Sequence, residues 1–312
     1  MKQYLLPLNR KFYKANLHSH STNSDGCYSP SELKQLYKSH GYSILSITDH
    51  FKFINHSDLS DSDFLFINGC ELAAVEDGDY QFKFKKCSHL NLYAKTPEKN
   101  GLFEYNLDYS LDSINRLIAD ANSNGFLVCC NHPTWSMECY RNLMNYTGLF
   151  GVEVFNTLSH VQGIDEYNCH EFDRMLRNGK TVYPIAADDC HGNLPDNHPF
   201  CDMFGGFVMI SATDLSYHSV ISALENGDFY ASTGPEIFEL LIENDIAVIK
   251  CSDAKEIKML TGTRRTARTA VSPKTNEYIS EAHFPVSKED KYFRFVVTDE
   301  YGNRALTRAY FC

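Results

Sequence analysis

The feature that most limits the fold of this chain is the placement of histidines and carboxylates at the margins of short apolar segments. Apolar segments alternate with amphipathic ones along residues 12–232, which is typical of βα units around a mostly parallel sheet. In an α/β barrel the strand ends converge on one cleft, so polar residues beside successive strands are brought together. The alternation predicts strands at 13–17, 43–48, 64–68, 90–94, 126–130, 151–155, 182–186 and 207–210, and helices at 31–39, 111–123, 164–177 and 217–225.

Nine residues at these margins are of types that bind divalent metals. His18 and His20 follow the first strand two residues apart, so in extended backbone both imidazoles point the same way. Asp189 and His191 repeat this spacing near the end of the series. Imidazole together with carboxylate is a ligand set that borderline divalent metals prefer. The predicted metal ligands are His18, His20, Asp25, His50, Glu71, His89, His132, Asp189 and His191.

Several of these positions also have ordinary structural explanations. Asp25 precedes a glycine and is suited to an Asx turn. Asp49 either orients a histidine or caps a backbone amide. His89, at a strand margin, is also explained as a half-buried residue, and Asp188 is the weaker alternative to Asp189. We expect no chemistry from the remaining histidines, of which His56 and His198 lie in predicted loops: His40, His56, His160, His170, His198, His218 and His283.

The pattern changes after the segment Thr233-Gly234-Pro235. Alternating stretches at 238–242, 246–251, 257–260 and 292–298 predict an antiparallel β-domain. We therefore expect a barrel over residues 1–234 and a small C-terminal β-domain of unknown role over 235–312. The basic cluster of this tail consists of Arg264, Arg265 and Arg268. It is interpreted either as a solvated turn or as an anion site.

Composition excludes some classes of protein. The net charge of −11 over 312 residues argues against extended nucleic-acid binding, which requires clustered basic residues. A small anionic substrate remains compatible with this charge, because bound dications supply positive potential. The eleven cysteines include no Cys-x-x-Cys pair, so they indicate neither a disulfide framework nor a thiolate zinc site. With no apolar run of membrane-spanning length and no signal peptide, we expect a cytoplasmic protein.

The motifs ANLHSHSTNSDG, SITDH, GCEL, SHLNL, NHP and ADDCHG resemble those of the PHP (polymerase and histidinol phosphatase) superfamily, stand-alone type. The resemblance spans about residues 14 to 234. It implies a distorted seven-stranded (β/α) barrel with a trinuclear site of zinc, manganese or iron. The implied ligands are His18, His20, Glu71 and Asp189 for one ion, Glu71, His89 and His132 for a second, and Asp25, His50 and His191 for a third.

The resemblance further implies a metal-dependent phosphoesterase that acts on a small-molecule phosphate ester through a metal-bridging hydroxide. His191 and Asp49 are candidates for supplying a proton to the leaving oxygen. Glu153, in the predicted strand 151–155, either contacts substrate or water or is paired structurally. The tail and the 231–235 segment look more like members grouped with carbamate-cleaving hydrolases. Carbamate, ester or amide hydrolysis is therefore an alternative function, and a non-catalytic metal-binding module is a third.

Overall fold

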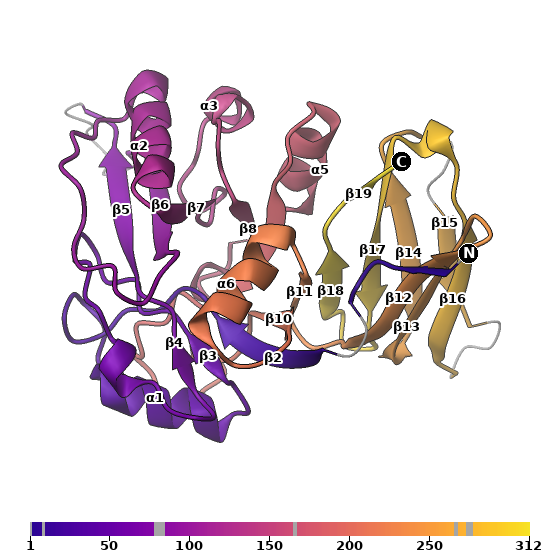
Figure 1. Cartoon of the computed structure of the whole chain (residues 1–312), viewed down its shortest axis with the longest axis horizontal. Helices are drawn as coiled ribbons and strands as arrows, with labels where there is room; N and C mark the ends of the chain where they lie inside the picture. Colours follow the sequence, from indigo (N-terminus) through magenta and orange to yellow (C-terminus); the bar gives the residue numbers. More distant parts are fainter. Residues whose placement is uncertain (1, 8–9, 78–84, 165–166, 265–267, 273–276) are drawn as a thin grey trace.

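The strands of the computed structural model form three hydrogen-bonded sheets, with helices packed around the N-terminal two-thirds (Figure 1). The structure describes residues 2–7, 10–77, 85–164, 167–264, 268–272 and 277–312. The result is a mixed α/β fold. The helices are α1 (Pro30–Ser39), α2 (Leu111–Ser123), α3 (Tyr140–Asn145), α4 (Thr157–Val161), α5 (Cys169–Arg177) and α6 (Tyr217–Asn226).

None of the helices in the described part of the chain combines the length and the apolar character needed to cross a membrane.

Local sequence explains where the main helices begin and end. Ser29 caps α1 and forms a capping box with Glu32, and Pro30 occupies the first turn, where its missing N–H costs nothing. Helix α2 has the predicted bounds. Helix α5 starts later than its predicted start at 164, and residues 165–166 of that prediction lie outside the described residues.

A five-stranded sheet carries several of the predicted metal ligands. Its order is β5-β6-β7-β8-β9, with parallel pairing only within β7-β8-β9. The expectation of a mostly parallel sheet is therefore wrong for β5 and β6, because the connection over residues 76–86 is too short for a crossover helix. It is also wrong for β10 (Phe207–Ala212), which pairs antiparallel with β2 (Lys11–Asn16) and β11 (Phe229–Ser232). The strands are β5 (Gly69–Val75), β6 (Cys87–Ala94), β7 (Phe126–Cys130), β8 (Gly151–Asn156) and β9 (Tyr183–Ala187).

A larger sheet continues from the N-terminal region into the C-terminal region. Its order is β15-β14-β17-β18-β11-β10-β2-β3-β4, and β19 also pairs with β17. Its strands are β2 (Lys11–Asn16), β3 (Ile44–Leu45), β4 (Leu65–Phe66), β10 (Phe207–Ala212), β11 (Phe229–Ser232), β14 (Glu256–Thr261), β15 (Arg268–Val271), β17 (Tyr292–Thr298), β18 (Arg304–Thr307) and β19 (Tyr310–Phe311).

The predicted closed seven-stranded barrel is not formed by the ladders of the described residues. Strands β3 and β4 are only two residues long, so regular pairing stops before the two sheets meet. Two isolated parallel bridges join the sheets instead, Ser19 to Cys190 and His50 to Glu71. These bridges lie beside the predicted ligands, which brings the ends of both sheets to one place.

The remaining sheet has the order β1-β12-β13-β16 and packs against the C-terminal part of the larger sheet. Ile249, Phe284 and Phe295 lie in the apolar core between them. The boundary at 234/235 stays a prediction, because β1 pairs with β12 and β11 pairs with β18 across it. The strands are β1 (Lys2–Tyr4), β12 (Ile237–Glu243), β13 (Ile246–Ala254) and β16 (Ile279–Pro285).

Candidate metal centre

The chain beyond β2 carries two buried histidines toward one centre. Ser19 bridges to Cys190, which keeps this segment extended, so His18 and His20 point the same way as predicted. Both side chains are fully buried, and their Nε2 atoms lie 3.3 Å apart. Two imidazole nitrogens that face each other at this distance are an arrangement that a shared cation would stabilise.

The carboxylate of Glu71, on β5, lies at the middle of the histidines and is 1% exposed. Asn131 Nδ2 donates a hydrogen bond of 2.7 Å to Oε1, which fixes the rotation of the carboxylate. Five imidazoles approach this one group. The separations are 3.4 Å to His18 Nε2, 3.5 Å to His20 Nε2, 3.0 Å to His50 Nδ1, 3.0 Å to His89 Nδ1 and 3.4 Å to His132 Nε2.

Asp189 is a second buried carboxylate of the centre. Its Oδ1 lies 3.2 Å from His18 Nε2 and 3.0 Å from His20 Nε2. The backbone of Asp189 has φ +56° and that of His132 has φ +23°, both unusual for residues with a side chain. Such backbone strain concentrates at functional sites. In this protein the strained backbone directs the side chains of His132 and Asp189 toward the centre, immediately after β7 and β9.

Asp25 reaches the centre from a turn. Its Oδ2 lies 3.6 Å from His50 Nε2 and 3.5 Å from His191 Nε2. The turn packs so closely that a Cβ on Gly26 would lie 2.2 Å from the carbonyl oxygen of His20. Glycine is therefore required where the turn approaches the extended segment that carries His18 and His20.

Asp49 holds this turn in place. Its carboxylate accepts hydrogen bonds from the Ser21 amide and hydroxyl, both 2.8 Å, and from the Ser24 hydroxyl at 2.7 Å. Asp49 is 1% exposed and the hydrogen bonds given above go to the turn, which is the geometry of the backbone-capping role. A role of Asp49 in proton transfer stays a prediction.

Glu153, at β8, is fully buried and contacts two predicted ligands. Its Oε1 lies 2.7 Å from His18 Nδ1, and its Oε2 accepts from the His132 amide at 2.9 Å and from Asn156 Nδ2 at 3.0 Å. A carboxylate behind a histidine fixes the ring orientation and raises the basicity of the other nitrogen. These contacts match the structural pairing that was one of the two alternatives for Glu153, and contact with substrate or water stays a prediction.

Other ring orientations are fixed in the same way. The Nδ1 atom of His132 is 3.0 Å from the Ser136 hydroxyl, and that of His191 is 2.9 Å from the Asp189 carbonyl oxygen. Because His191 Nδ1 must donate to a carbonyl, the neutral ring presents the lone pair of Nε2 toward Asp25. Nothing in the sequence indicates the contact of Ser136, and Asn131 stands out only as the neighbour of His132. Asn156 follows the predicted strand 151–155 and is, with Glu153, a candidate for contact with substrate or water.

Charge within the centre supports cation binding. Burial alone would raise the pKa of the Glu71 carboxyl, but the charges of His89 and His18 outweigh burial and hold that pKa well below its usual range. Burial alone would lower the pKa of His89. The charge of Glu71 outweighs burial and raises this pKa to about 10. A buried anionic centre that favours protonated imidazoles also favours divalent cations in their place.

The donor set fits divalent metals by its spacing. Ligands at about 2.0–2.1 Å from a tetrahedral ion lie about 3.3 Å apart, and the donor separations here are 3.0–3.6 Å. His50 Nδ1 and Glu71 Oε2 are 3.0 Å apart, yet neither atom has a hydrogen-bond partner. Three groups have all donor atoms within 4.8 Å of one another: His18, His20 and Asp189; His18, Glu71 and His132; and His20, Asp25, His50 and His191.

The nine predicted ligands therefore meet in one place, but the grouping differs in detail from the predicted one. His20 lies in two of these groups, with His18 and Asp189 and with the third set, and His89 lies in none of them and approaches through Glu71. His89 lies within β6, not before a strand as predicted. Asp188 points elsewhere, where it accepts from Tyr37, Thr157 and the amides of residues 204–206.

One side of the centre is open. The side chain of Asp25 is 53% exposed, that of His50 is 25% exposed and that of His191 is 16% exposed. Trp135 lies at this rim, with its ring 5.0 Å from His132 and 5.6 Å from His89. A small molecule has access from this side.

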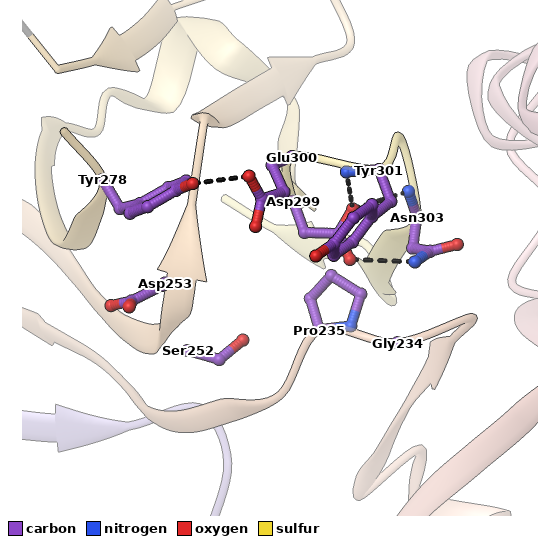
Figure 2. A pocket seen from close by; sticks show the side chains of 9 residues that line it. All are labelled: Gly234, Pro235, Ser252, Asp253, Tyr278, Asp299, Glu300, Tyr301 and Asn303. Carbon is purple, nitrogen blue, oxygen red and sulfur yellow. Dashed lines mark hydrogen bonds between the residues drawn. The ribbon is translucent and has the colours of Figure 1, made fainter. Parts of the chain in front are cut away.

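A separate cavity of about 550 Å³ lies in the C-terminal region (Figure 2). Two of its carboxylates are used locally, because Asp299 accepts from the amides of Tyr301 and Asn303, and Glu300 accepts from the Tyr278 hydroxyl. It contains none of the predicted ligands, so we assign it no chemistry.

No family model and no curated protein matches the chain. Several solved structures are similar to it, among them the following three. A two-domain protein from Bacteroides vulgatus containing a predicted PHP-like metal-dependent phosphoesterase is 16% identical, with 99% of this chain and 98% of that one covered and a TM-score of 0.49. A putative metal-dependent phosphoesterase from Bifidobacterium adolescentis is 14% identical, with 59% and 90% covered and a TM-score of 0.40. An amidohydrolase from Chromobacterium violaceum with bound sulfate and no metal is 15% identical, with 60% and 93% covered and a TM-score of 0.39.

Proposed function

We propose that this protein is a metal-dependent phosphoesterase that holds two or three divalent ions, zinc, manganese or iron, on its nine clustered side chains. The observation that carries the proposal is the buried Glu71 carboxylate with five imidazole nitrogens within 3.5 Å. Burying so many ionisable groups is costly unless a charged partner compensates them. The sequence motifs that resemble the PHP superfamily favour phosphate esters as substrates.

The ions, when bound, would lower the pKa of a water molecule and offset charge that develops on phosphoryl oxygens. The side chains of this protein would hold the ions in place. We assign His18, His20, Glu71 and Asp189 to one ion, Glu71, His89 and His132 to a second, and Asp25, His50 and His191 to a third, with Glu71 shared.

Other residues keep these ligands in position. Glu153 accepts a hydrogen bond from Nδ1–H of His18, so that Nε2 presents its lone pair to the centre. Asp49 holds the turn that carries Asp25. His191, on the open side, remains the candidate from the sequence for transferring a proton to the leaving oxygen, because Asp49 is engaged.

The substrate enters from the exposed side formed by Asp25, His50 and His191. The buried side of the centre is closed by His18 and His20, which keeps bulk water away from the ions. A small phosphate ester, and not an extended polymer, suits this one-sided access.

The first test is metal content. Elemental analysis of the protein, purified without chelator, is expected to show about two to three equivalents of first-row divalent metal per chain. Protein without bound metal that also fails to take up zinc, manganese or iron would end the proposal.

The second test is a substrate panel with p-nitrophenyl phosphate, bis(p-nitrophenyl) phosphate, a p-nitrophenyl ester and an aryl carbamate. We expect metal-dependent hydrolysis of at least one phosphate and weaker activity on the others. Faster turnover of the carbamate or ester would assign the same centre to that chemistry. A metal-loaded protein inactive on the whole panel would favour a non-catalytic module.

A further inference from the structure

A cleft lies between α5 and the C-terminal strands, on residues that the metal centre does not use. It consists of two adjoining cavities of about 420 and 300 Å³. Arg177, at the end of α5, and Gly262, after β14, line both cavities. Arg264 lines the first, and Lys291 lines the second. We call these two cavities the α5 cleft.

The α5 cleft is basic in a protein of net charge −11. The side chains of Arg177, Arg264 and Lys291 are exposed, and none of them forms an ion pair with another residue in the described ranges. Three uncompensated cations around one cavity repel each other, so their clustering favours an anionic ligand.

The carboxylates nearby do not neutralise these cations. Asp173, which also lines the first cavity, is held by Arg294 through bonds of 2.8 and 2.9 Å, and Arg294 is fully buried. Asp290 accepts from the Ser287 amide at 2.8 Å in a capping box. Asp173 is neutralised by Arg294, and the single charge of Asp290 cannot offset three cations, so the cleft keeps an excess of positive charge.

One wall of the cleft is fixed by backbone hydrogen bonds. The Gly262 amide donates to the carbonyls of Asp290 and Tyr292, both at 3.1 Å, which fixes the turn after β14. The Tyr292 side chain lines the second cavity and is 2% exposed. Burial raises the pKa of Tyr292, and the nearby charge of Arg177 offsets part of this effect, so Arg177 lies beside a buried polar wall of the cleft.

We propose that the α5 cleft binds a small molecule carrying two phosphate groups, one in each cavity, with Arg177 between them. The guanidinium fork matches phosphate oxygens in bidentate geometry, and Arg264 and Lys291 add one cation at each end. Phe311, 54% exposed at the second cavity, offers an apolar surface for the remainder of such a ligand. This site is independent of the metal centre.

The test uses the full-length protein stripped of metal and inorganic pyrophosphate as the probe, with titration calorimetry as the readout. We expect pyrophosphate to bind more tightly than inorganic phosphate or citrate. Arg177→Gln should weaken pyrophosphate binding by about 10-fold or more, as expected for loss of a charge-assisted hydrogen bond. Arg116→Gln, an exposed substitution on α2, is the matched control.

Two further variants remove the ambiguities. Arg264→Gln should also weaken binding, and it decides the question if Arg177→Gln does not fold. Glu71→Gln should leave pyrophosphate binding unchanged, because the cleft lies outside the metal centre. The proposal is overturned if the wild-type protein does not bind pyrophosphate, if neither arginine variant weakens binding, or if Glu71→Gln abolishes it. None of these outcomes bears on metal-dependent hydrolysis.

Discussion

The N-terminal and C-terminal regions bury polar groups in opposite ways. Around Glu71, imidazoles and carboxylates face one another in a centre that is buried except on the side of Asp25, His50 and His191. In the C-terminal region, residues such as Ile257 and Phe295 form an apolar core, and the buried charge of Arg294 is paired with Asp173. The comparison teaches that, under our proposal, the ionisable groups of the first region depend on bound cations, whereas the buried charge of Arg294 in the second has its partner within the chain.

The largest effect is expected from Glu71→Gln. The substitution removes the negative charge at the middle of the five histidines, where Glu71 is proposed to bind more than one ion. Metal content should therefore fall, and turnover should drop to that of metal-free protein. Circular dichroism should show a retained fold, and Glu104→Gln, an exposed loop substitution, should behave as wild type. Full activity in Glu71→Gln would show that the N-terminal region does not depend on cations bound at Glu71, which would contradict the comparison.

Arg294→Met tests the other side of the comparison. It leaves Asp173 without its partner in a mostly buried position, which should reduce the free energy of unfolding by about 3 kcal/mol. Denaturant unfolding measures this change, and metal content below the melting temperature should be unaffected. Adding Asp173→Asn should recover part of the loss; a double variant as unstable as the sum of both single variants would refute the pairing.

Glu153→Gln should have a smaller effect on the centre. Its amide group would present N–H donors to the His132 amide and to Asn156, and the charge behind His18 would be lost. We expect a decrease of about 10- to 100-fold in metal affinity or in kcat, which is typical of residues that orient metal ligands. Competition with a chromophoric chelator measures the affinity, and an unchanged value would contradict the positioning role.

The smallest effect is expected from Ile257→Val in the C-terminal core. Ile257 is fully buried, so deleting one methyl group should cost about 0.5–1.5 kcal/mol of unfolding free energy. Ile279→Val, at a half-buried position, should cost less. Neither variant should change metal content or hydrolysis, and a change in either would indicate coupling between the regions.

The sequence predicted much of this structure where local pattern decides it. The bounds of α2, β7 and β17 are as predicted, because each has a continuous apolar pattern between clear turn residues. The candidate ligands also meet in one centre, since each stands at or near a strand margin. The ligand assignment itself awaits the metal analysis.

Long-range pairing was not predictable in this way. Nothing in the 2–4 segment specifies β12 as its partner, and nothing in 304–307 specifies β11. The antiparallel β5 and the roles of Asp49 and Glu153 depend likewise on contacts between distant segments. Spacing along the chain finds residue types, whereas only the folded chain shows which carboxylates face a cation and which face an amide.

The pairing of β11 with β18 has a consequence for dissecting the protein. Separating the chain near residue 234 would strip Tyr230, Ala231 and Ser232 of their neighbours Thr307, Leu306 and Ala305. The exposed backbone would then offer a free template for strands of other molecules, which is a common origin of aggregates. An isolated N-terminal fragment is thus expected to be insoluble even with its metal ligands intact, so catalytic studies require the intact chain.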